Sequence, residues 1–380
     1  MKVQDWFKSG NPWIWLNAAA VSASLIMVFG LLGLIMIRGL GFFWPADVHL
    51  MDYVDEQNQQ VRLMGEIWDE EEVDREILIE NGVKLDTVDE FITRYTLKTG
   101  NRDVYGADFR LLLKPNIKTT ERPDDAMVVI RREWGNFYGF LDSIKEQGTL
   151  LVVSEDSLWS EFISRSDRVL DLHDQIVDIQ KSEIGDINHE LEKLRLKKRR
   201  YELDNKLSPE HIVELDAARK KQDARYEDVQ KRLNDLNQQI IRDSIVVRIA
   251  DGQTKEIQLD KVVKAYKPNQ MSVFAKTGAY FANIWEFVSD EPREANTEGG
   301  VFPAIFGTVM MVMIMAVLVT PLGVIAAVYL REYAKQGALT RTIRIAVNNL
   351  AGVPSIVYGV FGLGFFVYFL GGNIDRLFFS

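Results

Sequence analysis

Hydrophobic and polar positions divide this chain into an apolar beginning, a long mixed middle and an apolar end. Three runs contain no charged residue: 9–37 with 29 residues, 299–330 with 32, and 345–374 with 30. Because about 20 consecutive apolar residues cross the hydrocarbon core of a bilayer, each run is long enough to span it. The pattern therefore predicts three membrane-spanning helices, of which the first is too long for the apolar core of a cleaved signal peptide.

The middle of the chain changes from a strand pattern to a helix pattern. Between residues 61 and 153, short β-like runs are separated by Gly and Pro turns. Apolar residues then follow three-four spacing over 169–201, with one slip near Ile184, and again over 212–240. Two such stripes joined by the break at 207–210 predict an antiparallel coiled-coil hairpin.

Local signals predict how this hairpin turns and where the chain goes next. Ser208 can cap the second helix, and Pro209 suits its first turn. Asp251 and Gly252 stand between two β-like runs, which is a strong signal for a β-hairpin. We expect these strands to rejoin the earlier ones, so that the coiled coil, at about 155–243, is an insertion in one α+β domain.

Residues 272–288 predict an amphipathic helix immediately before the second apolar run. One face collects mostly aromatic residues, namely Phe274, Gly278, Phe281, Trp285 and Val288. A face of this kind beside a spanning segment suits the membrane–water interface. Packing against the domain core is the alternative, and the sequence leaves both open.

The predicted fold class is therefore a membrane α-helical protein with a large extracytoplasmic α+β domain that contains an antiparallel coiled-coil hairpin. Residues 1–43 hold the N-terminal segment and the first transmembrane helix, and 44–271 the α+β domain. An amphipathic helix and linker follow at 272–298, and two transmembrane helices at 299–380.

The distribution of charge predicts the orientation of the three spans in the membrane. The net charge is −10, with +2 over residues 1–43 and +3 over 301–380, so the middle holds −15, which argues against nucleic-acid binding. Against the single acidic Glu332, the short connection 331–344 contains four basic residues, Arg331, Lys335, Arg341 and Arg344. Because basic short loops stay in the cytoplasm, we expect a cytoplasmic N-terminus and a periplasmic 44–300 in a bacterial inner membrane.

Candidate chemistry is sparse. The chain has no cysteine and no Gly-Lys dipeptide, and hence no thiolate site and no Walker A loop. The acidic run 68–76 lacks the glycine spacing of a calcium loop. The four histidines lie far apart in sequence, at His49, His173, His189 and His211. We therefore predict no catalytic residue and no metal site, and do not expect an enzyme.

The remaining distinctive residues are prolines and glycines in the second and third apolar runs. Pro321 lies well inside the second run with Gly323 beside it, and Pro354 lies near the start of the third. Proline removes a helix hydrogen bond and permits a kink, and freed backbone groups at membrane depth need protein or water to receive them. This indicates helices that move or line a path; kinks in a static bundle are the alternative.

The motifs GGVFPAIFGTVMMV, PLGVIAAVYLREYA and NNLAGVPSIVYGVFGLGFF closely resemble the membrane domain of permease subunits of bacterial phosphate-specific ABC transporters, in the order of the A-type subunit. The resemblance covers roughly residues 11–45 and 290–375, and the outer region is similar to that of the long-loop variety. It implies that Pro321 and Gly323 belong to a kinked helix. It also implies that a signature segment near the central gate contains Gly352, Pro354, Ser355 and Gly359.

This resemblance implies a permease subunit of an ATP-driven phosphate importer that works by alternating access, with no cofactor in this chain. The expected partners are a second permease subunit, a cytoplasmic ATPase dimer, a periplasmic phosphate-binding protein and the lipid bilayer. Family members continue with further spans and an ATPase-docking loop, so up to Ser380 the sequence resembles a permease truncated at its C-terminus. The competing hypothesis is a non-transporting inner-membrane scaffold or sensor with a periplasmic coiled coil.

Overall fold

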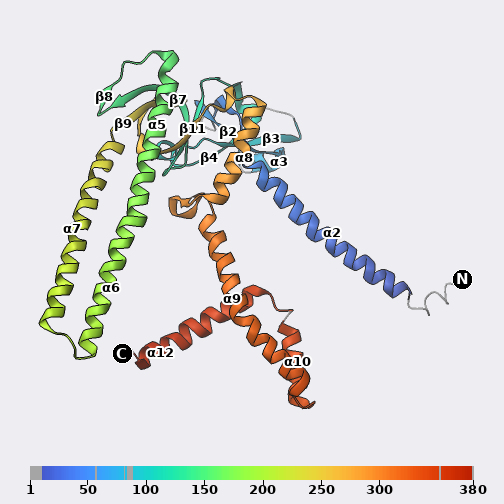
Figure 1. The fold of residues 1–380 in the computed structure, drawn as a ribbon. Coiled ribbons are helices and arrows are strands. Elements are labelled where there is room, and N and C mark those ends of the chain that lie inside the picture. Colours follow the sequence, from blue (N-terminus) through green and yellow to red (C-terminus); the bar gives the residue numbers. More distant parts are fainter. Residues whose placement is uncertain (1–10, 56–57, 81, 84–88, 351, 379–380) are drawn as a thin grey trace, which may run out of the picture. The chain divides into compact units, whose positions relative to one another are not determined.

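The chain forms two compact units, one up to Phe302, with strands and helices, and one from Pro303 onward, built in its described part from helices. A computed structural model gives the fold (Figure 1). It describes residues 11–55, 58–80, 82–83, 89–350 and 352–378.

The first unit begins with the long helix α2 (Asn11–Gly41) and continues into a five-stranded antiparallel sheet of order β4-β3-β2-β1-β5. Gly65 of β2 lies so close to β3 that a Cβ there would stand 2.1 Å from the carbonyl oxygen of Lys98, so only glycine fits. The short helix α3 (Arg75–Glu80) lies between β2 and β3 in sequence, and α4 (Arg102–Tyr105) between β3 and β4. The strands are β1 (Val48–Val54), β2 (Gln60–Asp74), β3 (Phe91–Lys98), β4 (Phe109–Leu113) and β5 (Ile117–Glu121).

A second antiparallel sheet has the order β10-β9-β7-β6-β11, with β8 paired to β7. The predicted β-hairpin is confirmed, because β9 pairs with β10 and Gly252 takes a φ of +89° at the turn. β9 also pairs with β7, so the chain rejoins the earlier strands as expected. The strands are β6 (Met127–Arg131), β7 (Asn136–Glu146), β8 (Thr149–Leu150), β9 (Asp243–Arg248), β10 (Thr254–Gln258) and β11 (Val262–Tyr266).

Between β8 and β9 the chain forms a pair of long helices that lie side by side (Figure 1). The outgoing arm consists of α5 (Glu155–Asp178), a π-helical turn (Ile179–Glu183) and α6 (Ile184–Leu203). The returning arm is α7 (Pro209–Ile240). Ser208 caps α7 by accepting a hydrogen bond from the backbone N–H of His211, and Pro209 is its first residue, both as predicted.

The apolar stripes of these helices face each other and the second sheet. Val169 and Ile187 of the outgoing arm and Val229 of the returning arm are almost completely buried. They belong to the same buried cluster as Phe137 of β7 and Ile245 of β9. Burial of each side chain of this size contributes about 1.5–3 kcal/mol to stability relative to exposure. The helical pair is therefore held to the second sheet by a shared apolar core.

Within the described residues, three helices are long and apolar enough to cross a membrane: Trp13–Gly41, Phe302–Tyr333 and Ser355–Arg376. The chain is therefore a multi-pass helical membrane protein that also contains two large sheets. The second unit is built from α9 (Phe302–Val328), a π-helical turn (Tyr329–Tyr333), α10 (Ala338–Leu350), α11 (Ser355–Phe361), a π-helical stretch (Gly362–Gly371) and α12 (Gly372–Phe378).

The third predicted span began ten residues too early. Residues 345–350 belong to α10, whose beginning carries Arg341 and Arg344, and the apolar helix begins only at Ser355. The physical reason is the Gly352-Val353-Pro354 sequence, because proline disfavours helical backbone in the residue before it and its own nitrogen cannot donate to a preceding carbonyl. A stretch without charge is thus not always one continuous helix.

Candidate functional site

Pro321 and Gly323 lie inside α9, where the sequence placed them. The helix continues through Pro321, so the kink stays a prediction. Outside the neighbouring turns of α9 itself, no described atom comes within 4 Å of the position that a Cβ on Gly323 would occupy. This part of α9 therefore presents a narrow, open face, of the kind that lets another membrane helix approach closely.

The basic connection between the second and third spans is a compact, hydrogen-bonded turn. Arg344 donates to the carbonyl oxygen of Leu330 at 3.0 Å, and the Thr340 hydroxyl donates to that of Lys335 at 2.8 Å. Arg331, whose side chain is 85% exposed, lies in the π-helical turn before it. Of the four predicted basic residues, Arg331 and Lys335 thus lie before α10, in the turn, and Arg341 and Arg344 lie in the first half of α10.

The segment containing Gly352, Pro354 and Ser355 is a break between two helices and not a kink within one. Pro354 has extended backbone (φ −56°, ψ 137°) and stands directly before α11, which begins at Ser355. The Tyr358 hydroxyl reaches back to donate to the carbonyl oxygen of Leu350 at 2.7 Å. The expectation that Pro354 bends the third span is wrong; the proline starts this span.

Gly359, in the first turns of α11, has no atom of the described chain within 4 Å of a Cβ position. Gly352, Pro354, Ser355 and Gly359 therefore share one helix break and the helix that follows it. They are not joined to Pro321 and Gly323 by packing at either open glycine.

A second arrangement of polar and aromatic residues surrounds α8 (Val273–Ser289) in the first unit. Its aromatic face is exposed, with Phe274 at 90%, Phe281 at 64% and Trp285 at 71%. The alternative that this face packs against the domain core is therefore wrong. The opposite face is fastened to the chain that follows α2: Asn283 donates to the carbonyl oxygen of Phe43 at 3.0 Å, and Lys276 pairs with Asp47.

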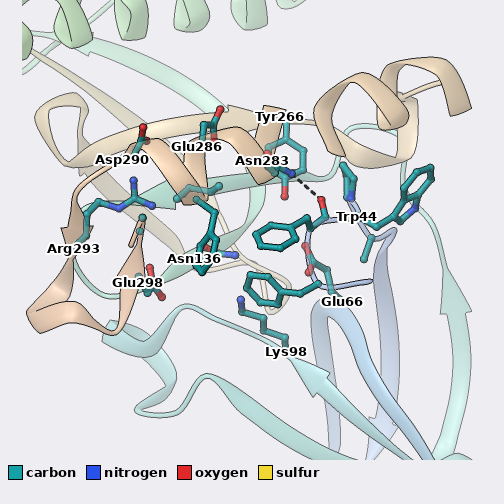
Figure 2. Close-up of a pocket in the computed structure, with 18 of the residues that line it drawn as sticks. Trp44, Glu66, Lys98, Asn136, Tyr266, Asn283, Glu286, Asp290, Arg293 and Glu298 are labelled. Carbon is teal, nitrogen blue, oxygen red and sulfur yellow. Dashed lines mark hydrogen bonds between the residues drawn. The ribbon is translucent and has the colours of Figure 1, made fainter. Parts of the chain in front are cut away.

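Behind α8 lies a cavity of about 260 Å³ (Figure 2). Its walls come from the residues after α2, from β2 and β3, from the inner face of α8, and from Gly299 and Gly300, which precede α9. Six ionisable residues line it, four carboxylates and two cations: Glu66, Glu286, Asp290, Glu298, Lys98 and Arg293. Sequence reasoning missed this site, because its residues are spread from Phe42 to Gly300 and no short motif contains them.

The electrostatics of the cavity depend on how deeply each charge is buried. Glu66 is 9% exposed, and burial raises the pKa of its carboxyl above the usual value, although the charge of Lys98 opposes this. Burial likewise raises the pKa of Glu298, again against Lys98. The Lys98 ammonium lies over the ring of Trp68, 5.0 Å from its centroid. The carboxyl of Glu66 is therefore buried, and that of Glu298 half-buried, without full compensation of a negative charge.

Comparison with known proteins relates part of this chain to transport permeases. Part of this chain is similar to permeases of phosphate transport systems. It is 44% identical over 73 residues to the phosphate transport system permease protein PstA 1 of Mycobacterium tuberculosis (strain H37Rv), covering 19% of this chain and 23% of that protein. It is 35% identical over 109 residues to the phosphate transport system permease protein PstC of Mesorhizobium japonicum, covering 26% and 33%.

A probable ABC transporter permease protein, YqgI of Bacillus subtilis, is 32% identical over 87 residues, which cover 23% of this chain and 30% of that protein. The chain thus spans less than two thirds of each of these curated relatives. Relatives named PstA and PstC both match, so the similarity supports an ABC transporter permease without distinguishing the subunit type. No protein-family model matches the chain. No solved structure matches it either.

Proposed function

We propose that this chain is a transmembrane permease subunit of an ATP-driven phosphate importer, of the A type. The observation that carries the proposal is the similarity to phosphate transport permeases at 35–44% identity, in a chain with three apolar helices. The helix break at Pro354 and the open glycine faces of α9 and α11 are in keeping with it. ATP hydrolysis belongs to a separate subunit, and this chain needs no cofactor.

In the proposed complex, the partners are a second permease subunit, a cytoplasmic ATPase dimer and a periplasmic phosphate-binding protein. Gly323 and Gly359 would face helices of the second permease subunit, because small residues let membrane helices pack closely. The extended backbone at Pro354 separates α10 from α11 and would let α11 tilt as a rigid body. Such tilting is one way for a bundle to alternate between outward and inward openings.

The proposed orientation places the basic connection 331–344, with Arg331, Lys335, Arg341 and Arg344, in the cytoplasm of a bacterial cell, at its inner membrane. Residues 44–300 are then periplasmic, and the helical pair is a coiled coil that projects from the α+β domain. The exposed aromatic face of α8 then lies in the membrane–water interface on the periplasmic side of the inner membrane, where Trp and Phe side chains are favoured.

The proposed function is tested by measuring uptake of radiolabelled phosphate in cells that lack this chain and in cells that express it again. We expect the first to take up much less phosphate at low external concentration and the second to recover, while sulfate uptake stays the same in both. Equal phosphate uptake with and without the chain would contradict a role as phosphate permease.

A further inference from the structure

The wall of the cavity behind α8 includes residues that follow the end of α2 and residues that precede the start of α9. Pro45 follows α2 by a few residues, and Gly300 stands just before α9. If α2 and α9 cross the membrane, as the proposed function has it, the walls of the cavity lie at the level where the chain leaves the lipid. The cavity is therefore placed to meet the headgroups of the outer leaflet.

Helix α8 has one face toward the cavity and the opposite, aromatic face exposed. The inner face of α8 supplies Asn283, Glu286 and Phe287 to the cavity wall, and its outer face carries exposed Phe274 and Trp285. A ligand whose polar part entered the cavity could therefore keep an apolar part outside, against the aromatic face. This division matches the two parts of a phospholipid.

The charges of the cavity select the polar part. Lys264 pairs with Glu286 at 2.8 Å, so the other three carboxylates of the wall, Glu66, Asp290 and Glu298, share two lining cations, Lys98 and Arg293. An excess of carboxylates repels a ligand that carries only negative charge. A cationic group beside a buried carboxylate lowers the free-energy cost of burying that charge. Aromatic rings in the same wall, among them Phe43 and Trp68, also attract ammonium groups.

Two further observations point to a ligand. Glu66 is nine-tenths buried and points into the cavity (Figure 2). Its carboxyl has the Tyr138 hydroxyl beside it but makes no ion pair within the described part of the chain. Arg293 lines the same space, and its buried Nε has no hydrogen-bond partner among the described residues. A zwitterion can satisfy both, with an ammonium on the carboxylate and a phosphate on the guanidinium.

The volume of the cavity suits a lipid headgroup but not a whole lipid. The volume of about 260 Å³ is smaller than the roughly 300–1,000 Å³ of sites that enclose drug-sized ligands. It has room for a phosphate, two carbons and an ammonium, and no room for acyl chains. We propose that the cavity binds the headgroup of an aminophospholipid, phosphatidylethanolamine in chemistry, with the acyl chains outside along the aromatic face of α8.

The proposal is tested by native mass spectrometry of the full chain, purified in detergent and freed of lipid, with one added lipid at a time. We expect phosphatidylethanolamine to be retained more strongly than phosphatidylcholine, whose ammonium has no N–H to donate, and phosphatidylglycerol to be retained least. E66Q and E298Q should each weaken retention of phosphatidylethanolamine about tenfold, the effect of losing one charge-assisted hydrogen bond. E72Q, an exposed carboxylate of the same strand β2, is the matched control and should bind as wild type.

E298Q is included because Glu298 is less buried than Glu66, so this variant should fold even where E66Q does not. Equal retention of phosphatidylglycerol, or unchanged binding in both variants, would overturn the proposal. Binding of soluble phosphoethanolamine without retention of the lipid would assign the cavity to a soluble amine and overturn the lipid part. Because the readout involves no transport, this proposal and the phosphate permease can fail independently.

Discussion

At the scale of single residues, Asp243 decides how the helical pair is fastened to the second sheet. Its fully buried carboxylate accepts hydrogen bonds from Arg165 at 3.0 Å and Arg168 at 2.8 Å, both on α5, and from its neighbour Arg242 at 3.0 Å. Burial alone would raise the pKa of Asp243, but the hydrogen bond from Arg242 and the charges of the three arginines hold it below its usual range. Asp243, the first residue of β9, thus ties α5 to the strand that follows α7.

D243N should lower the free energy of unfolding by about 3 kcal/mol, because removing one partner of a buried ion pair leaves the other charges uncompensated. We place the effect at the low end of the usual range since Arg168 and Arg242 are each 31% exposed. Urea unfolding of the full chain in detergent, followed by tryptophan fluorescence, measures it. E192Q, which removes an exposed partner of Arg195, is the control and should unfold like wild type.

The same substitution predicts a pH dependence. Since the pKa of Asp243 is lower in the folded chain than in the unfolded one, its stabilisation is fully present above the unfolded pKa of about 4 and is lost as the pH falls through the folded pKa. The difference in unfolding free energy between wild type and D243N should therefore be constant near neutral pH and shrink in strong acid. A difference that grows on acidification would refute this account of Asp243.

At the scale of elements, the slip in the apolar stripe has a structural cause. Ile179 and Ile187 are eight residues apart, one more than the seven that return a side chain to the same face after two turns. The π-helical turn Ile179–Glu183 absorbs the extra residue, so that both isoleucines are buried. The sequence showed where the regular spacing fails, and the wide turn is how the helix continues through it.

Removing one residue from this turn should therefore be tolerated. Deletion of the exposed Ser182 restores seven-residue spacing and allows regular helix, so the midpoint of thermal unfolding should stay the same or rise. Insertion of one alanine after Ser182 rotates everything beyond it by about 100° and should lower the midpoint by several degrees. Circular dichroism measures both. Equal losses for deletion and insertion would mean that the turn does not correct the register.

Elements with strong local signals could be predicted from the sequence, and the site behind α8 could not. Ser208 and Gly252 act through their immediate neighbours, so the cap of α7 and the turn between β9 and β10 were readable. The start of the third span was misplaced, because lack of charge says nothing about the effect of Pro354 on the backbone. Glu66 and Glu298 meet only through tertiary structure, and in a chain so acidic neither stands out.

At the scale of the whole molecule, orientation in the membrane follows from the basic turn between the second and third spans. The chain has no cysteine, so single cysteines introduced as V152C and Q336C report on topology without background. Val152 is fully exposed before α5, and Gln336 is exposed in the basic turn. In spheroplasts, we expect an impermeant maleimide to label V152C at once and Q336C only after permeabilisation. The reverse pattern would invert the proposed topology.

The central claim is that the helix break and open glycine of the third span belong to a phosphate path shared with another subunit. The most direct measurement is the initial rate of phosphate uptake by cells that express P354L or G359L, with G185L in the exposed helical pair as the matched control. Outside its own helical turn, no described atom lies within 4 Å of a Cβ on Gly359, so the proposed packing there is against a helix of another subunit. An overpacking cost of about 1–3 kcal/mol at Gly359 predicts roughly a 5- to 150-fold fall in uptake at unchanged protein level. P354L should also lower uptake, because it removes the proline of the helix break, and G185L should leave uptake unchanged. Normal uptake by both P354L and G359L would contradict the account.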